Sequence, residues 1–343
     1  MTIIFESVNL RAKLIDGADF ARSVITFSSF AKPATLDRPG FGEEFFRAEG
    51  IAAMHVVARG NRWFQYKELP ALITALREHS ARYERVISYG SSMGGFAALV
   101  YGADCGANLG IAISPQISLN HRDAPFETRW RGEAARIRHW YPPKKVLSEQ
   151  IIAYDPHHAL DSQHYEAFAS RALTRSLRIS HGGHPAGACL AQAGLLKRLV
   201  RDAFANRFDP HIYERILHSN RCRSSQYLYT VSRRLKPHHA DLKLRLAEVA
   251  LYFDKSPHIY SLVANCLAAV GRNDEAEIMH RHALDFDDGD SLVAYAIYLS
   301  KVQRYSEAME MIDRTISKSP DSRALKLLRL KMRFLCFFLQ QIK

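Results

Sequence analysis

The sequence predicts an α/β domain with a mainly parallel sheet, followed by an all-α domain built from helical repeats. Over residues 1–205, short apolar runs rich in β-branched residues alternate with longer helix-like stretches, which is the pattern of strands joined by crossover helices. Residues 86–99 pass from an apolar run through a tight, glycine-containing turn into a run of small residues. After about residue 206 the strand pattern stops and one helical pattern follows another.

Six segments of the first domain are expected to be core strands, because they are nearly continuous hydrophobic runs, as strands buried on both faces are. They are residues 23–27, 52–58, 85–89, 110–114, 150–154 and 176–180, and helices are expected at 69–82, 94–102, 162–173 and 186–204. The stretch 116–149 is long, charged and aromatic, too long for a simple crossover. We therefore expect it to be a helical cap inserted over the edge of the sheet.

The composition is that of an ordinary globular protein, with 343 residues, 47% hydrophobic and 24% charged. The formal net charge of +12 is spread evenly over both domains. A nucleic-acid-binding protein concentrates its basic residues in a stripe or a known module, so no nucleic-acid partner is expected. A generally basic surface suits an anionic substrate, an acidic partner or a membrane face.

Several classes of protein are not expected from this sequence. No stretch approaches the roughly 18 apolar residues of a membrane helix, so no transmembrane segment is expected. The N-terminus lacks the regions of a secretory signal, and a cytoplasmic location is expected. The five cysteines are scattered and form no C-x-x-C pair, which argues against disulfides and zinc. Neither a metal nor a cofactor is expected, because the histidine pairs lack completing ligands and residues 90–95 match no phosphate-binding loop.

The second domain, residues 206–343, contains an internal repeat. Residues 271–276 align with residues 303–308 when Arg272 is matched to Arg304, an offset of 32 residues. Each unit is a helix, a short turn, a second helix with a small residue for close packing, and a stop. This pattern resembles the tetratricopeptide repeat over residues 240–322, with 323–343 as a capping helix, and implies a binding module for a protein partner. A plain helical bundle is the alternative.

The segment Gly90-Ser91-Ser92-Met93-Gly94 is a Gly-x-Ser-x-Gly motif between a strand-like and a helix-like run. The glycines allow the backbone to bend sharply, so that the serine is exposed above the sheet on a strained turn. This context predicts a nucleophile elbow with Ser92 as the nucleophile.

A nucleophilic serine needs a base, and the base needs an acid to orient it. After the strand at 176–180 comes the sequence His181-Gly182-Gly183-His184, and we expect His184 to be the base, with His181 as the alternative. Asp155 directly follows the strand at 150–154, and Asp161 comes six residues later. We expect Asp155 to be the acid and Asp161 to cap the following helix, although the two roles could be exchanged.

The oxyanion hole should use the backbone N–H of Met93, the residue after the nucleophile, and a second N–H from the loop after the strand at 23–27. Candidates for that second donor are Ser28, Ser29 and Phe30. In the loop at 59–65, Asn61 and Trp63 are candidates to line the substrate pocket, although Trp63 could instead pack under the loop.

Residues 1–205 resemble the α/β-hydrolase superfamily of serine hydrolases. The resemblance rests on Gly90-x-Ser92-x-Gly94, on Asp155 and on Gly183-His184, in the order Ser, acid, His, each after a strand. This chain departs from the family in a shortened N-terminal sheet and an unclear oxyanion loop. The resemblance implies an esterase-like reaction on a small-molecule or saccharide ester through an acyl-serine intermediate. The alternatives are an acyltransferase with the same triad and a non-catalytic scaffold.

Overall fold

The computed structural model describes residues 1–18, 20–31, 33–318 and 323–341, and the chain divides into two units, Met1–Asn220 and Arg221–Lys343. In the first unit, eight strands of the described residues form one sheet in the order β1-β2-β4-β3-β5-β6-β7-β8. They are β1 Thr2–Glu6, β2 Leu10–Ile15, β3 Arg22–Phe27, β4 Ala52–Ala58, β5 Arg85–Ser91, β6 Leu109–Ile113, β7 Glu149–Tyr154 and β8 Leu173–Arg178.

The sheet is mainly parallel, as the sequence predicts. Strands β3 to β8 run parallel to one another, whereas β2 is antiparallel to both β1 and β4. The six expected core strands correspond to β3–β8. The expectation of a shortened N-terminal sheet is wrong, because β1 and β2 extend the sheet. Strand β2 was not recognised because five of its six residues are buried, so it lacks the alternation of buried and exposed residues that marks a strand with one exposed face.

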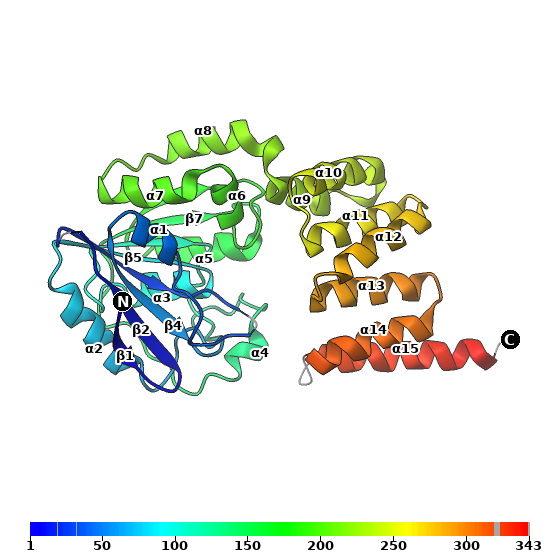
Figure 1. Ribbon diagram of the computed structural model, residues 1–343, viewed down its shortest axis with the longest axis horizontal. Coiled ribbons are helices and arrows are strands. Elements are labelled where there is room, and N and C mark those ends of the chain that lie inside the picture. The colour runs from blue at the N-terminus through cyan, green and yellow to red at the C-terminus, as the bar shows by residue number, and fades with distance from the viewer. Residues whose placement is uncertain (19, 32, 319–322, 342–343) are drawn as a thin grey trace. The chain divides into compact units, whose positions relative to one another are not determined.

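The helices of the first unit lie on both sides of the sheet (Figure 1). They are α1 Glu43–Ala48, α2 Leu69–Ser80, α3 Met93–Val100, α4 Arg131–Ala134, α5 Ala159–Ala169, α6 Gly187–Gln192, α7 Leu195–Phe204 and α8 Pro210–Asn220. Helix α3 packs against β3, β5 and β6, and the core of the unit surrounds it. The helix expected at 186–204 is broken in two, because Gly194 adopts a positive φ of 69° between α6 and α7.

Residues 116–149, which were expected to form an inserted helical cap, are mostly irregular. Among the described residues of this segment, α4 is the one helix. Backbone turns and side-chain hydrogen bonds together satisfy polar groups of this segment. For example, Ser118 donates to Asp123 at 3.1 Å, and the amide of Lys144 donates to Asp104 at 2.8 Å. The charged and aromatic composition therefore reflects an ordered loop instead of a helical cap.

Helix α8 belongs to the first unit, although residues from 206 onward were expected in the second. It packs against β8, and Tyr213 on α8 is 1% exposed. The hydroxyl of Tyr213 donates to Asp202 of α7 at 2.8 Å, and the amide of Arg178 donates to Glu214 at 3.2 Å. These contacts move the end of the first unit from the expected residue 205 to Asn220.

The described part of the second unit is entirely helical (Figure 1). Its elements are η1 Arg221–Arg223, α9 Ser225–Arg234, η2 Pro237–His239, α10 Ala240–Phe253, α11 Pro257–Ala269, α12 Asn273–Leu284, α13 Gly289–Lys301, α14 Tyr305–Lys318 and α15 Arg323–Gln341. Helices adjacent in sequence pack against each other, notably α11 with α12 and α13 with α14.

The offset of 32 residues seen in the sequence recurs in the contacts. Ala276 of α12 and Ala308 of α14 are both completely buried. Just before each helix, an arginine pairs with a glutamate three residues later: Arg272 with Glu275, and Arg304 with Glu307, each with a 2.6 Å bond from Nε. The repeated segments therefore share a local structure as well as a sequence pattern.

We predict that Gly94→Ala destabilises the first unit, because a Cβ at Gly94 would lie 2.2 Å from the carbonyl oxygen of Phe27 at the end of β3. Relieving that clash should cost roughly 1–3 kcal/mol and lower the thermal unfolding midpoint by several degrees. Gly132→Ala is the matched control, since nothing lies within 4 Å of its added Cβ. Equal midpoints for the two variants would contradict this account of the packing between α3 and β3.

Candidate active site

Ser92 lies at a sharp turn between β5 and α3. Its backbone has φ 50° and ψ −114°, a conformation that is unfavourable for a residue with a side chain. The turn is fixed because the amide of Ser92 donates to the carbonyl of Ile113 at 2.8 Å. Close packing also explains the first glycine of the motif, because a Cβ on Gly90 would lie 2.3 Å from the backbone of Gly94. These features are those of a nucleophile elbow.

His184 is brought to Ser92 by the loop that follows β8. The Oγ of Ser92 and the Nε2 of His184 are 3.0 Å apart. The loop is anchored at the residue before the histidine, where the amide of Gly183 donates to Asp155 at 2.9 Å. The alternative base, His181, stacks on His157 with ring centroids 4.5 Å apart. The structure therefore brings His184, the expected base, to the serine.

The structure differs from the sequence prediction in the acid. Asp161 lies against His184, with distances of 3.0 Å and 2.9 Å from Nδ1 to its two carboxylate oxygens. Asp155, the acid we expected, instead accepts bonds from the backbone amides of His157, His181 and Gly183 at 2.9, 3.1 and 2.9 Å. The physical reason is position: Asp155 directly follows β7 and is completely buried, and the six residues that follow carry Asp161 toward the imidazole.

Asp161 is also not the cap that we expected for α5. The capping residue is His158, whose Nδ1 accepts from the amide of Asp161 at 3.3 Å. The same Nδ1 lies 3.2 Å from a carboxylate oxygen of Asp161.

The carboxylate of Asp161 is buried and surrounded by cationic or N–H groups. Arg129 of the inserted segment donates to it at 2.9 Å, in addition to His184 and His158. Burial by itself would raise the pKa of Asp161, but the hydrogen bonds from His158 and His184 outweigh it and hold the pKa well below its ordinary range. Asp161 is therefore ionised at neutral pH, as an acid that orients an imidazole must be.

Arg129 also joins this carboxylate to a second buried acid. Its guanidinium contacts Glu127 at 2.7 Å, and Glu127 accepts from Nε2 of the buried His164 at 2.7 Å. The Nδ1 of His164 accepts from the amide of Ile117 at 3.1 Å, which places the ring proton on Nε2. A ring whose Nδ1 accepts is neutral, and burial lowers the pKa of His164 in the same sense. The chain from Asp161 through Arg129, Glu127 and His164 thus ends on the backbone beside Gln116.

Gln116 is a site residue that the sequence analysis missed. Its side chain is completely buried, and its Nε2 lies 3.3 Å from the Oγ of Ser92 and 3.5 Å from Nε2 of His184. Its Oε1 accepts from the indole N–H of Trp63 at 2.9 Å, which fixes the orientation of the amide. The available signal was its position three residues after the end of β6, the strand next to β5, where a polar side chain can reach the end of β5.

Asn61 and Trp63, which were expected to line the substrate pocket, make contacts with other residues of the protein. Asn61 forms two bonds with the backbone of Ala31, at 2.8 Å and 3.1 Å, and so joins the loops after β3 and β4. Trp63 is 1% exposed and packs against Phe30 and Trp130. Its connection to the site is indirect and runs through Gln116.

For the oxyanion hole, Met93 is the first residue of α3, where the backbone N–H has no acceptor within the helix. Ser28 already donates its amide to Val56 at 2.9 Å, and its hydroxyl accepts from Arg38 at 2.8 Å. The hydroxyl of Ser29 donates to the carbonyl of Ser91 at 3.1 Å, which draws this loop to the elbow. The source of the second N–H stays a prediction, with Ser29 and Phe30 as the candidates.

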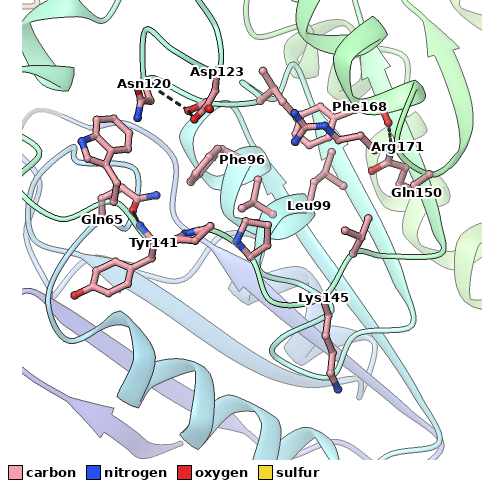
Figure 2. Close-up of a pocket in the computed structure, with 18 residues that line it drawn as sticks. Gln65, Phe96, Leu99, Asn120, Asp123, Tyr141, Lys145, Gln150, Phe168 and Arg171 are labelled. Carbon is pink, nitrogen blue, oxygen red and sulfur yellow. Dashed lines mark hydrogen bonds between the residues drawn. The ribbon is translucent and has the colours of Figure 1, made fainter.

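A cavity of about 400 Å³ lies beside helix α3 (Figure 2). Its lining includes Phe96 and Leu99 of α3, Tyr141 of the inserted segment and Phe168 of α5. Ser92, Asp161 and His184 are not among its lining residues. The cavity is thus a feature separate from the serine.

The described residues also bear on the classes of protein considered above. Within them, no helix has both the length and the apolar character needed to cross a bilayer. Cys105, Cys189 and Cys266 are buried free thiols, and Cys222 is an exposed one; the side chain of Cys336 lies outside the described part of the structure.

No protein-family model and no curated protein sequence matches the chain. Solved structures do match. The capsule O-acetyltransferase of Neisseria meningitidis serogroup A has 15% identity and a TM-score of 0.43, over 59% of this chain and 93% of that one. Est1E from Butyrivibrio proteoclasticus has 14% identity and a TM-score of 0.41, over 60% of this chain and 98% of that one. At this degree of similarity, neither protein's activity transfers to this chain.

If Asp161 orients His184, then Asp161→Asn should slow the reaction of Ser92 with a fluorophosphonate probe by roughly a hundredfold or more, because the amide favours the wrong imidazole tautomer. Asp155→Asn is the matched variant and should slow the labelling less, because it only loosens the loop after β8 that Asp155 anchors. The measurement is the second-order labelling rate of each folded variant. A larger loss in Asp155→Asn would reverse the assignment.

The buried Glu127 predicts a pH dependence of stability. Burial alone would raise its pKa, but the bonds from His164 and Arg129 lower it from 4.5 to about 2. A carboxyl group whose pKa is lower in the folded than in the unfolded chain stabilises the fold. This stabilisation is complete at pH values above the pKa of the unfolded chain, and it is lost as the pH falls through the pKa of the folded chain. Glu127→Gln should therefore unfold at a lower temperature than the wild type at pH 7.

The difference in midpoint between Glu127→Gln and the wild type should shrink as pH falls from 4.5 to about 2. Glu133→Gln is the control, because Glu133 lies in the same segment but its partner Arg136 is 3.6 Å away and more than half exposed. Thermal unfolding across this pH range is the measurement. A difference for Glu127→Gln that stays constant with pH would contradict the ionised pair.

Proposed function

We propose that the first unit is a serine hydrolase or acyltransferase that forms an acyl-enzyme on Ser92. One observation carries this proposal: the Oγ of Ser92, the imidazole of His184 and the carboxylate of Asp161 form one continuous hydrogen-bonded series. The two contacts use opposite nitrogens of the ring, which is the arrangement needed to deprotonate a serine. The strained conformation of Ser92 supports it, since such strain concentrates at active sites.

The reaction proceeds in two balanced halves. The Oγ of Ser92 attacks the carbonyl carbon of an ester while Nε2 of His184 takes the hydroxyl proton, and Asp161 stabilises the imidazolium that results. The N–H of Met93 faces the oxyanion. The bond from carbon to the leaving oxygen then breaks, and Nε2 returns its proton to that oxygen. Water or an alcohol attacks the acyl-serine by the reverse path, giving an acid or a new ester.

The second unit supports a proposed role in binding a protein partner. The repeated burial of Ala276 and Ala308 and the repeated arginine–glutamate pairs favour tetratricopeptide-like units over an unrelated helical bundle. A scaffold without catalysis is the competing function for the whole chain. The series from Ser92 to Asp161 favours an enzyme, because a scaffold has no need of a strained serine beside an oriented base.

A fluorophosphonate probe tests the proposal, because it reacts covalently with activated serines. The wild type should gain the mass of one label, whereas Ser92→Ala and His184→Ala should gain none within the same time, a loss of roughly 10⁴-fold or more. Ser91→Ala, one residue away, is the control and should label. Intact-protein mass spectrometry reads the result, and a folded wild type that stays unlabelled would favour the scaffold.

A further inference from the structure

We propose that helix α15 of the second unit binds the surface of an anionic lipid bilayer through an exposed apolar stripe formed by Leu327, Leu330 and Phe334. These three side chains are called the outer stripe below. The inference goes beyond the proposed acyl chemistry and does not depend on it, because α15 belongs to the unit that does not contain Ser92. In this arrangement α15 lies along the bilayer, with the outer stripe at the boundary between headgroups and acyl chains.

Helix α15 has apolar side chains on two opposite faces. Its inner face packs against α14 (Figure 1), where Met332 is 4% exposed and Leu328 is partly buried in the core of the unit. On the other side, Leu327, Leu330 and Phe334 are 66%, 64% and 63% exposed. They follow one another at intervals of three and four residues, so they form one continuous stripe along the helix.

The outer stripe distinguishes α15 from an ordinary capping helix. The last helix of a repeat array normally has a polar outer face, which keeps the end of the array soluble. Large apolar side chains gathered on an exposed face instead indicate a surface that binds a partner or a membrane. The sequence analysis expected a cap here, and the exposed face of α15 shows a second property that a cap does not need.

The charges of α15 favour an anionic partner. The helix carries five basic residues and no acidic one among its 19 residues. Arg329 pairs with Asp313 of α14 at 2.6 Å, whereas Lys326, Lys331 and Arg333 are exposed and form no ion pair with any described residue. At about 100° per residue, Lys331 lies on one flank of the outer stripe, and Lys326 and Arg333 lie on the other.

A bilayer fits this arrangement better than a second copy of the chain or a protein groove. Two copies of α15 placed face to face would bring cations against cations, which is unfavourable. A groove that holds the outer stripe alone would leave the cations on its flanks without partners. An anionic bilayer meets both features, because the stripe enters the interface while the long basic side chains on either flank reach the headgroups.

The experiment measures binding of the full chain to sedimented vesicles, made either of phosphatidylcholine alone or with roughly a quarter phosphatidylserine. The wild type should bind the anionic vesicles, and less so as salt rises, because salt screens the headgroup charge. Leu327→Gln/Leu330→Gln removes two members of the outer stripe and should weaken this binding by roughly 100-fold. Both side chains are exposed, so circular dichroism should show an unchanged helical content.

Two further variants test the charges and the location. Lys326→Gln/Lys331→Gln removes one cation from each flank and should weaken binding to the anionic vesicles by roughly 30-fold, with little change for phosphatidylcholine alone. The matched control is Leu242→Gln/Val249→Gln on α10. These side chains are 47% and 43% exposed, but α10 carries both acidic and basic residues, so this variant should bind as the wild type does.

The outcomes are distinguishable. A folded wild type that binds neither kind of vesicle overturns the inference, whatever its reaction with the fluorophosphonate probe. Binding that is unchanged in Leu327→Gln/Leu330→Gln, or lost equally in the α10 control, also overturns it, because the contact then lies elsewhere. A wild-type dimer in sedimentation velocity that Leu327→Gln/Leu330→Gln dissociates, without vesicle binding, would assign the outer stripe to a second copy of the chain.

Discussion

The buried negative charge of Asp161 is the constraint on which the site depends. A buried carboxylate is tolerated only when paired and hydrogen-bonded, and its partners come from three parts of the chain: His158 at the start of α5, Arg129 of the inserted segment and His184 after β8. Satisfying one charge therefore fixes three loops at the carboxyl edge of the sheet. These contacts hold the imidazole of His184 with its Nε2 3.0 Å from the Oγ of Ser92.

The inserted segment shows how an irregular chain can be ordered without regular secondary structure. Arg129 lies between Asp161 and Glu127, and Glu127 binds the neutral, fully buried His164, which in turn accepts from the amide of Ile117. In a site of low dielectric, each of these bonds is strong, and each would be costly to leave unmade. The same network that holds the carboxylate thus also fixes the backbone at Ile117, next to Gln116.

The sequence predicts the sheet well because buried parallel strands are local hydrophobic runs. It leads to Ser92 and His184 because each lies in a glycine-containing turn that follows a strand. It fails where spatial position depends on the path of a loop. Asp155 and Asp161 are the same residue type and close in sequence, and only the turn between them decides which meets His184. Gln116 carries no motif, and its role depends on an indole 53 residues away. The inserted segment was misjudged because its order comes from such long-range bonds, not from helical propensity.

We expect Asp161 to bind the Nδ1 proton of His184 and so to prepare Ser92 for acyl chemistry. An imidazole N–H that is bonded to a carboxylate gives a strongly deshielded proton resonance, which proton NMR can observe in the whole protein. This resonance should be present in the wild type, in Ser92→Ala and in Asp155→Asn, and absent in Asp161→Asn and His184→Ala. A resonance that survives in Asp161→Asn and disappears in Asp155→Asn would show that Asp155, not Asp161, binds the imidazole proton.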